Sequence, residues 1–406
     1  MYRFAISPTR DMHIADLQLA LLNYICAKQN KKNFVIRIED TQKNKRIEGK
    51  DNEIIDLLSI FGVNYDALYY QNENFKYHLQ FASSLMSKGK AFSCFCTEEE
   101  LKKSKIYSGK CINISQEELL NNNLPFVIRI KKPTNEIYIN DSIKTKINFE
   151  ADKIDSLIIM EEKKYPTSNF ANACDDMIQG ISHIICDKNN LEDSPKQEYI
   201  RESLGFTEKL YYTHISIISD NINLKSLLDQ GFLPEAIINY LLALEKEISS
   251  IEEAIDSFKI ENISKCPSKF DIEKLKIINK QQIQSLSDME ISKIIGYSSS
   301  DIGKLAKLYS KKFSTTFEIK NRIDKIFSKK SSKLYIEELK KLKNIVKEAP
   351  YFENFDGFKK YLQEQSKLEN EKFSKPFSIM ITDEEDEENL ENIYNLIKNY
   401  IQEIAR

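Results

Sequence analysis

The sequence predicts an α/β protein built on a parallel sheet and followed by a region that is almost wholly helical. Residues 2–6 and 34–38 are short runs with strand character, and apolar residues recur at helical spacing between residues 14 and 25. This order is one βαβ unit, which favours parallel strands joined by a crossover helix. After about residue 210, apolar residues recur every three or four positions among lysines and glutamates, which predicts helices.

Residues 69–165 have a different pattern, which predicts an inserted α+β domain. A helical segment there is followed by Cys94-Phe95-Cys96 and by a strand-like run at residues 126–133. The parallel sheet is then expected to resume in two strands, at residues 156–160 and 181–186. Between them, residues 170–178 are expected to form a helix.

Composition excludes several classes of protein. With 406 residues and 41% hydrophobic residues, the chain can form roughly two to four domains with real cores. Lys and Arg total 59 against 62 Asp and Glu, so the net charge of −3 is not basic overall, and RNA contacts must come from local patches. A charged-then-apolar leader and a run of roughly 18 apolar residues are both missing, which predicts a cytoplasmic protein without a membrane segment. Seven cysteines indicate reduced thiols or metal ligands rather than disulfides.

A strand, a turn and a helix at residues 3–17, followed by a strand that ends in Glu39-Asp40, have the order of a phosphate-binding α/β unit. Close approach of the backbone to phosphate normally calls for glycine, yet no glycine precedes Gly49. The whole chain has 10 glycines, where average usage would give roughly 28. Because Lys, Asn and Ile are abundant, this scarcity indicates compositional drift that can remove glycines without functional meaning.

Seven segments carry a resemblance to a known family, namely residues 3–21, 37–41, 70–73, 94–99, 166–171 with Asp175-Asp176, 194–197 and 231–241. In order and spacing they resemble the bacterial glutamyl-tRNA synthetases, class I enzymes with a Rossmann-type catalytic domain. The resemblance implies five parts: catalytic halves at 1–80 and 166–210, an inserted acceptor-stem-type domain at 81–165, a stem-contact helical segment at 211–270 and an α-helical anticodon-binding-type region at 271–406.

The resemblance also implies the family reaction, in which glutamate is joined to the α-phosphate of ATP, with Mg²⁺, and is then passed to tRNA. Family members open a helix at the triphosphate with His-Ile-Gly-His, and the matching residues here are His13-Ile14-Ala15-Asp16. His13 is the retained catalytic position and is expected to donate to a phosphate oxygen. Ala15 replaces the glycine over which the nucleotide lies, and Arg10 replaces another expected glycine. Asp16 either favours the helix start or repels phosphate.

Part of the glutamate pocket implied by the resemblance is retained. Arg3, Ser7, Glu39 and Asn169 match positions that hold the substrate. Arg3 would pair with a carboxylate and Glu39 with the α-ammonium group, both through charge-assisted contacts.

Two other positions of that pocket depart from the family. Ser168 stands where the family has tyrosine, and Cys186 stands where it has the arginine that clamps the substrate carboxylate. Lys188 could supply positive charge from nearby, but it lacks the planar bidentate fork of arginine. Loss of one such contact is expected to weaken binding by about 1.5–3 kcal/mol.

The family's basic loop is also missing. Family members follow the strand that matches residues 214–218 with Lys-Met-Ser-Lys-Arg or Lys-Leu-Ser-Lys-Arg, whose lysines neutralise the triphosphate. Residues 219–228 of this chain instead run directly towards the next helix. Lys225 is the candidate remnant of the loop, and Lys188 and Lys225 are the candidate phosphate contacts. Because electrostatic preorganisation is usually the largest catalytic effect, this loss predicts a much lower rate.

Cys94, Cys96, Tyr107 and Cys111 resemble the zinc site found in part of this family. Three thiolates and one oxygen would complete a tetrahedron around Zn²⁺. Cys-x-Cys alone has little specificity, so reduced cytosolic thiols remain the alternative.

Three functions are compatible with these residues. A motif-degenerate paralogue with weak or lost aminoacylation, which retains tRNA or protein binding, is favoured because three ATP and glutamate elements are altered together. The second is a divergent but active glutamate–tRNA ligase that acts on tRNA-Glu or is specialised for tRNA-Gln. The third is a regulatory protein-interaction module that uses the acidic run at residues 383–388. Because the family is mostly monomeric, a monomer is expected.

Overall fold

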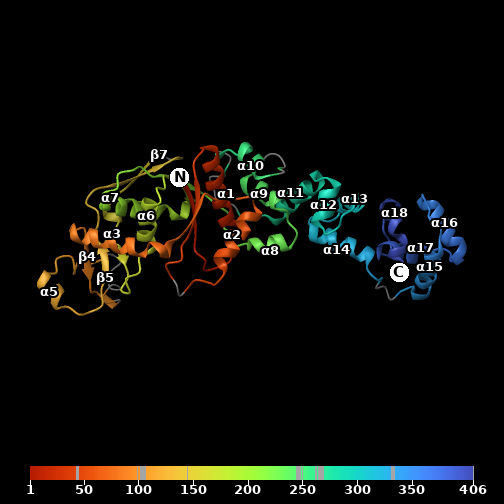
Figure 1. The fold of residues 1–406 in the computed structure, drawn as a ribbon, viewed down its shortest axis with the longest axis horizontal. Helices are drawn as coiled ribbons and strands as arrows, with labels where there is room; N and C mark the ends of the chain where they lie inside the picture. Colours follow the sequence, from red (N-terminus) through yellow and green to blue (C-terminus); the bar gives the residue numbers. More distant parts are fainter. Residues whose placement is uncertain are drawn as a thin grey trace. The chain divides into compact units, whose positions relative to one another are not determined.

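The computed structural model describes residues 1–42, 45–97, 99–100, 107–143, 145–243, 248, 250–260, 263, 269–330 and 334–405. The chain divides into two compact units, and Figure 1 labels the helices and strands of both. The first unit comprises residues 1–225, 241–244 and 249–270, and the second comprises residues 226–240, 245–248 and 271–406. In the described part of the chain, no helix is both long and apolar enough to cross a membrane.

The first unit is built around a seven-stranded sheet in the order β3-β2-β1-β9-β10-β6-β7. Its strands are β1 (Tyr2–Ile6), β2 (Phe34–Ile38), β3 (Ala67–Tyr70), β6 (Ile137–Asp141), β7 (Thr145–Phe149), β9 (His183–Asp187) and β10 (Tyr211–Ile215). Neighbouring strands are parallel, except in the antiparallel hairpin of β6 and β7. The predicted strands at residues 2–6, 34–38 and 181–186 are therefore confirmed as strands of a parallel sheet.

Burial explains why the first βαβ unit forms. Every residue of β2 is buried, as expected for a parallel strand covered on both faces. The crossover helix α1 (Ile14–Gln29) packs on β1, β2 and β9, and most of its residues are buried. A helix that is apolar nearly all round belongs in a protein core, so α1 is fixed with its N-terminus at the end of β1.

A second, three-stranded antiparallel sheet contains β4 (Ala91–Cys94), β5 (Val127–Ile130) and β8 (Ile158–Met160). The prediction that residues 156–160 resume the parallel sheet is wrong, because β8 pairs with β5 and buries Ile159 and Met160 in a separate core. Conversely, β6 and β7 come from the segment interpreted as an insertion but join the large sheet through β10. The ranges of the five parts therefore stay predictions.

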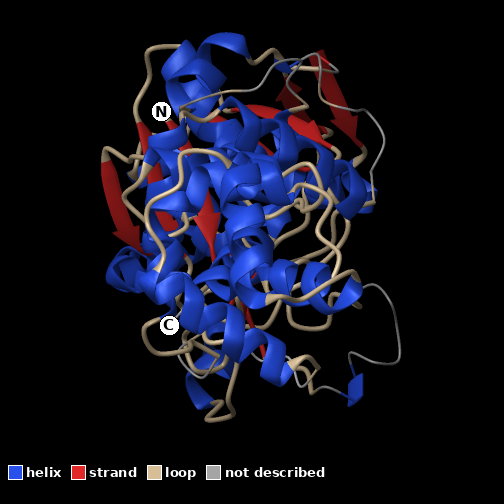
Figure 2. Ribbon diagram, turned by 90° about the vertical axis from the view of Figure 1, so that its right-hand side faces the viewer, coloured by secondary structure: helices blue, strands red, loops and turns tan. Residues whose placement is uncertain are grey.

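Helices of the first unit pack against both of its sheets. In Figure 2 all helices are blue and all strands are red. Besides α1, the helices of the first unit are α2 (Lys50–Ile60), η1 (Gln71–Asn74), α3 (Phe75–Ser87), α5 (Gln116–Asn121), η2 (Ala151–Lys153), α6 (Ser168–Ile178), η3 (Lys188–Glu192), α7 (Ser194–Leu204) and α10 (Ile251–Ser257). Helix α6 confirms the helix predicted at residues 170–178. Two further helices, α8 (Leu224–Asp229) and α9 (Pro234–Leu242), contain residues of both units.

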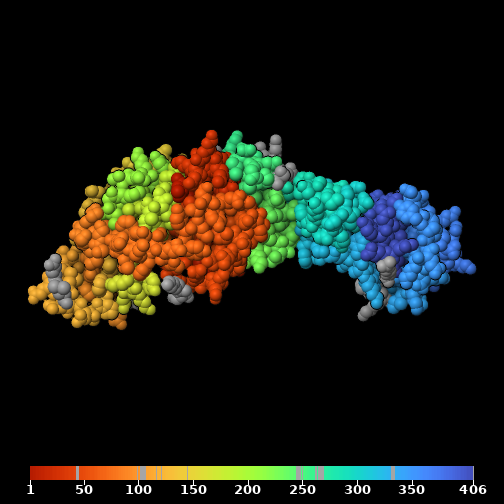
Figure 3. Space-filling view, viewed as in Figure 1, coloured from red at the N-terminus to blue at the C-terminus, as the bar shows by residue number. Residues whose placement is uncertain are grey.

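The second unit is helical in all its described regular structure, as predicted. It contains α11 (Ile272–Ser285), α12 (Asp288–Ile294), α13 (Ser300–Tyr309), α14 (Thr316–Phe327), α15 (Ile336–Glu348), α16 (Phe355–Ser366), α17 (Glu371–Thr382), α18 (Leu390–Ile397), η5 (Lys398–Tyr400) and α19 (Ile401–Ile404). Their apolar faces form one core in which Phe358 stacks on Tyr394 with ring centroids 4.8 Å apart. These helices are cyan to blue in the space-filling view (Figure 3).

The acidic run at residues 383–388 is partly used inside this unit. Glu387 Oε2 accepts a hydrogen bond from Arg322 Nη2 at 3.0 Å, and Glu384 lies 3.4 Å from the same guanidinium group. Glu385 lies 3.7 Å from Lys375. Because Arg322 is buried, these acids balance a charge in the protein rather than forming only a solvated surface.

Candidate active site

The turn between β1 and α1 lies where ligands bind in α/β sheets. From β1 the chain moves outward to β2, whereas β9 later joins the opposite side of β1, so the strand order reverses between β1 and β9. Ligands of open α/β sheets bind beyond the carboxyl ends of the strands at such a reversal. His13 is the N-cap residue of α1, which places it at this edge together with the partial positive charge of the helix N-terminus.

The negative charge of Asp16 is paired with a positive charge within the turn. Its carboxylate accepts two hydrogen bonds from Arg10, at 2.7 Å from Nη1 and 2.9 Å from Nη2, and one from the backbone N–H of His13 at 2.8 Å. The hydrogen bond to Asp16 raises the pKa of Arg10. Of the two roles left open for Asp16, these contacts favour a stabilising acid at the helix start, and an adjacent guanidinium group offsets its repulsion of phosphate.

The segment after β10 docks on this turn and uses part of its backbone. Hydrogen bonds join the two segments from Ile14 N to Ile222 O at 2.9 Å, from Leu224 N to Met12 O at 3.0 Å, and from Asn223 Nδ2 to Asp11 Oδ2 at 2.8 Å. The first N–H of α1 is therefore already bonded to protein. Lys225, the candidate remnant of the basic loop, is exposed at the start of α8.

An ion cluster joins strands β1 and β2 to helix α6. Asp176 of α6 accepts hydrogen bonds from Arg3 Nε at 2.7 Å and Nη2 at 3.1 Å, and from Arg37 Nη1 at 2.6 Å. Burial alone would raise the pKa of Asp176, but the two guanidinium groups lower it. Asp176 therefore stays ionised and fixes the orientation of Arg3.

One nitrogen of Arg3, Nη1, makes no hydrogen bond in the described part of the chain. This nitrogen is not sealed from solvent. Cys186, at the position of the family's arginine, lies near Arg3, and burial raises the pKa of its thiol to about 12 although Arg3 opposes this. A neutral thiol cannot pair with a carboxylate as a guanidinium group does.

The other predicted pocket residues have separate surroundings. Glu39 Oε1 lies 3.6 Å from Arg37 Nη2. Asn169 donates to Asp193 and accepts from Gln197, each at 3.0 Å. The remaining three are half-buried or exposed: Ser7 after β1, Ser168 in the first turn of α6 and Lys188 at the start of η3. Their predicted roles towards glutamate and phosphate stay predictions.

Sequence reasoning missed the importance of Asp176 and Arg37. The adjacent acids Asp175 and Asp176 belong to no recognisable motif by themselves. Two acids in an amphipathic helix nevertheless indicate paired carboxylates, because a buried carboxylate needs a partner. Asp175 uses its carboxylate for His78, whose Nε2 lies 2.8 Å from Oδ1, and for Gln71 at 2.9 Å.

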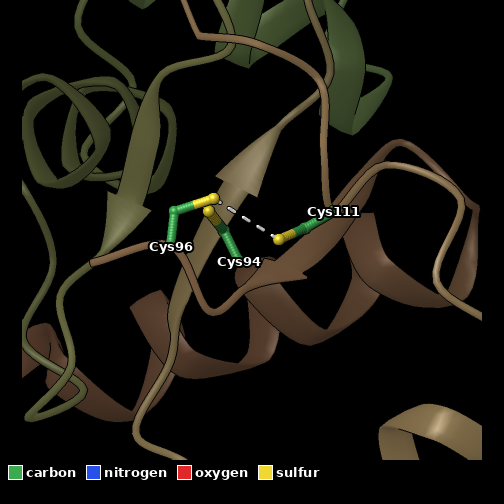
Figure 4. Close-up of side chains that lie close together, drawn as sticks. All are labelled: Cys94, Cys96 and Cys111. Atoms are coloured by element: carbon green, nitrogen blue, oxygen red, sulfur yellow. Dashed lines mark hydrogen bonds between the residues drawn. The ribbon is translucent and has the colours of Figure 1, made fainter. Parts of the chain in front are cut away.

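The predicted metal ligands come together at the end of β4. The sulfur atoms of Cys94, Cys96 and Cys111 lie within 4.8 Å of one another and point towards a common centre (Figure 4). Cys96 and Cys111 are 3.6 Å apart, close to the edge of roughly 3.8 Å expected for sulfurs at 2.3 Å from a tetrahedral zinc ion. The Tyr107 hydroxyl lies 3.5 Å from Cys94 and 4.0 Å from Cys96.

The chemistry of this donor set fits zinc. Burial and the neighbouring thiols raise the pKa of Cys96 to about 12, so several thiolates at this place require a cation. Arg129, buried beside the cluster, lies 4.5 Å from the centre of the Tyr107 ring. Arg129 and Tyr107 lower the pKa of Cys94, although burial opposes them. Bound zinc would deprotonate the thiols and tie the turn at Cys111 to β4.

Comparison with known proteins now defines the family. The model of the catalytic domain of class I tRNA synthetases (E and Q) matches residues 1–277. Over 432 aligned residues the chain is 41% identical to glutamate–tRNA ligase 2 of Sulfurimonas denitrificans and 43% identical to glutamate–tRNA ligase 1 of Nitratiruptor sp., with 100% of each chain covered.

The chain belongs to the glutamyl-tRNA synthetase family. Solved glutamyl-tRNA synthetases have the same fold. The glutamate–tRNA ligase of Elizabethkingia meningosepticum in complex with its amino acid has a TM-score of 0.78 and 22% identity, with 99% of this chain and 97% of that chain covered. The predicted class I architecture, with a Rossmann-type core and a helical C-terminal region, is thereby confirmed.

Proposed function

We propose that this chain is a glutamate–tRNA ligase, which joins glutamate to the α-phosphate of ATP and transfers it to tRNA. Identity of 41–43% along the whole length of relatives with that name carries the proposal. Class I synthetases use ATP with Mg²⁺, and we expect the same of this chain. Its proposed substrates are glutamate and tRNA, and the protein is proposed to act as a monomer in the cytoplasm. The loss of activity predicted from the altered motifs is the competing outcome.

Two contacts support activation of glutamate at the β1–α1 edge. Arg3 is held by Asp176 yet keeps Nη1 for a substrate carboxylate. Asp16 is paired with Arg10, which offsets one of the altered features expected to disfavour ATP. Cys186 and the shortened run at residues 219–228 still favour a rate below that of synthetases with the full motifs.

The test is glutamate-dependent ATP–pyrophosphate exchange, with and without total tRNA because activation in this family generally requires tRNA. An intact synthetase is the positive control, and His13→Ala sets the background. Exchange above that background supports the proposal. A folded wild-type protein that stays at background in both conditions would overturn it in favour of the motif-degenerate paralogue.

The tRNA partner is measured separately. Aminoacylation of tRNA-Glu and tRNA-Gln transcripts distinguishes the two substrates considered for an active ligase. If neither is charged, gel shifts over a salt series distinguish a tRNA-binding paralogue from a protein-interaction module, because binding to phosphates weakens as salt rises.

We also propose that Cys94, Cys96 and Cys111 hold Zn²⁺, with Tyr107 Oη as the oxygen nearest to the cluster. The ion would stabilise the segment around β4 and take no part in the reaction. Metal analysis of protein purified without chelator tests this assignment, and one zinc ion per chain is expected.

A further inference from the structure

The turn between β1 and α1 contains a cation that no predicted role uses. Arg10 occupies the position of a family glycine, and half of its side chain is exposed. Its guanidinium group is fixed by Asp16 and by the carbonyl of Asp11, to which Nη1 donates at 2.8 Å. Nη1 also lies 3.2 Å from Nδ1 of His13, the residue expected to meet a phosphate oxygen.

The hydrogen bonds of Arg10 leave one edge of the guanidinium group open. Asp16 takes the edge formed by Nη1 and Nη2. Nε and the outer hydrogen of Nη2 form the other edge, and neither has a hydrogen-bond partner among the described residues. Two parallel N–H groups of arginine match two oxygens of a phosphate, so Arg10 can hold Asp16 and a phosphate group at once.

Two other donors at the turn, the N–H of Ile14 and the ammonium group of Lys50, are already bonded to protein groups. The N–H of Ile14 is bonded to Ile222, so the N-terminus of α1 offers one fewer backbone donor to an anion. Lys50, the buried lysine next to the turn, is held by Asp11 at 2.6 Å and Glu53 at 2.8 Å. The side chain of Arg10 is therefore the charged donor at this turn with an open bidentate edge.

We infer that Arg10 is a phosphate-binding residue of this chain, and that its Nε–Nη2 edge holds the triphosphate of ATP beside His13. The inference rests on the proposed function and names a residue of the same site. Asp16 is then a positioning residue that orients the guanidinium group, not a repulsive substitution. Arg10 supplies part of the positive charge that a basic loop supplies in other family members.

The experiment is titration calorimetry with Mg·ATP, with and without total tRNA, alongside pyrophosphate exchange. The variants are Arg10→Ala, Arg10→Lys, Asp16→Asn and the double variant Arg10→Ala/Asp16→Asn. Lys209→Ala removes an exposed lysine outside the turn as a matched control. Circular dichroism confirms that each variant is folded.

Arg10→Ala is expected to weaken ATP binding about 10- to 100-fold, since one charge-assisted contact is lost. Arg10→Lys should recover only part, because lysine has no planar fork. Asp16→Asn should weaken ATP binding less than Arg10→Ala does, because asparagine keeps one oxygen that can accept from the guanidinium group. The double variant should bind as weakly as Arg10→Ala. Wild-type affinity in Arg10→Ala, or recovery of affinity in the double variant, would overturn the inference, because Arg10 would then serve only to neutralise Asp16.

Failure of the two proposals gives different results. Exchange that is insensitive to Arg10 overturns the role of Arg10 and leaves the ligase function standing. Arg10-dependent binding of ATP without exchange overturns the ligase function and leaves the phosphate site. A folded wild-type protein that neither binds ATP nor exchanges pyrophosphate overturns both.

Discussion

The ion cluster around Asp176 and the cysteine cluster at β4 both bury groups whose charge must be balanced, and they do so differently. Asp176 receives two arginines from neighbouring strands of the sheet, at 2.7 Å and 2.6 Å. At β4, three thiols meet a phenol, and the pKa of Cys96 is raised to about 12. In the first cluster the charge of the buried acid is balanced by arginines of the same chain, whereas the second needs a metal ion to hold several thiolates.

The largest effect should follow from breaking the cluster that needs an ion. Cys111→Ser removes one of three sulfur ligands, and structural zinc binding contributes roughly 10 kcal/mol or more to folding in small zinc domains. We expect zinc content to fall from one ion per chain towards zero and the segment around β4 to become sensitive to protease. Cys26→Ser, which changes a buried thiol in α1, should keep its zinc. Equal metal content in the two variants would refute the zinc assignment.

Removal of the charge of Asp176 should destabilise the cluster whose charge is balanced within the chain. Asp176→Asn leaves the buried Arg37 and the partly buried Arg3 without the carboxylate that they hydrogen-bond, and the only acid that still pairs with either of them in the described residues is Glu39, 3.6 Å from Arg37. This loss is expected to cost about 3–5 kcal/mol of unfolding free energy. Urea denaturation followed by circular dichroism measures the change, and Asp152→Asn is the control because Asp152 is 94% exposed. A loss below about 1 kcal/mol would mean that solvent screens these arginines. In that case the two clusters would not differ as described.

Glu198 of α7 offers a third comparison, because it is a mostly buried acid whose charge is balanced less well than that of Asp176. Burial raises its pKa to about 7, although Arg201, at 3.3 Å, opposes the shift. The folded state then holds a proton that the unfolded state releases near pH 4.5. Stability should therefore fall as pH rises from about 4.5 to 7, by up to about 3 kcal/mol.

Glu198→Gln should flatten this part of the pH profile of unfolding free energy, while Glu208→Gln, an exposed neighbour, should keep it. If the wild type, Glu198→Gln and Glu208→Gln all showed the same change of unfolding free energy between pH 5 and 7, the expected effect of Glu198 would be absent. Arg201 would then balance the charge of Glu198 fully.

The smallest effect is expected at Lys110, which precedes Cys111 in the sequence but is not one of the proposed metal ligands. Its side chain is 63% exposed and pairs with Glu100 at 2.6 Å. Exposed ion pairs contribute little, so Lys110→Ala should leave zinc content and melting temperature unchanged. A clear loss of zinc would show that the cluster depends on charge beyond its ligands.

Local pattern was sufficient to predict the first βαβ unit, helix α6 and the helical second unit, since each has a period or a long apolar run. It failed for β8, whose three residues carry no information about the strand that pairs with them. The resemblance identified Cys94, Cys96 and Cys111, which the fold brings together.

Contacts between distant residues explain the rest of the difference. Arg3 and Asp176 are 173 residues apart, so no local period reveals their pairing. Arg10 and Asp16 are only six residues apart, but the bend of the turn decides that they meet. The repulsion of phosphate considered for Asp16 therefore did not include the guanidinium group of Arg10, which pairs with it.

The docking of the segment after β10 on the β1–α1 turn has a consequence for synthesis of the protein. Asn223 and Asp11 are separated by 212 residues, and the bond from Ile14 to Ile222 spans a similar distance along the chain. Strand β1 and helix α1 leave the ribosome early, but their turn gains these hydrogen bonds only after more than half of the chain has been translated. A nascent chain that stops before residue 222 would therefore carry the first βαβ unit without the finished turn between β1 and α1.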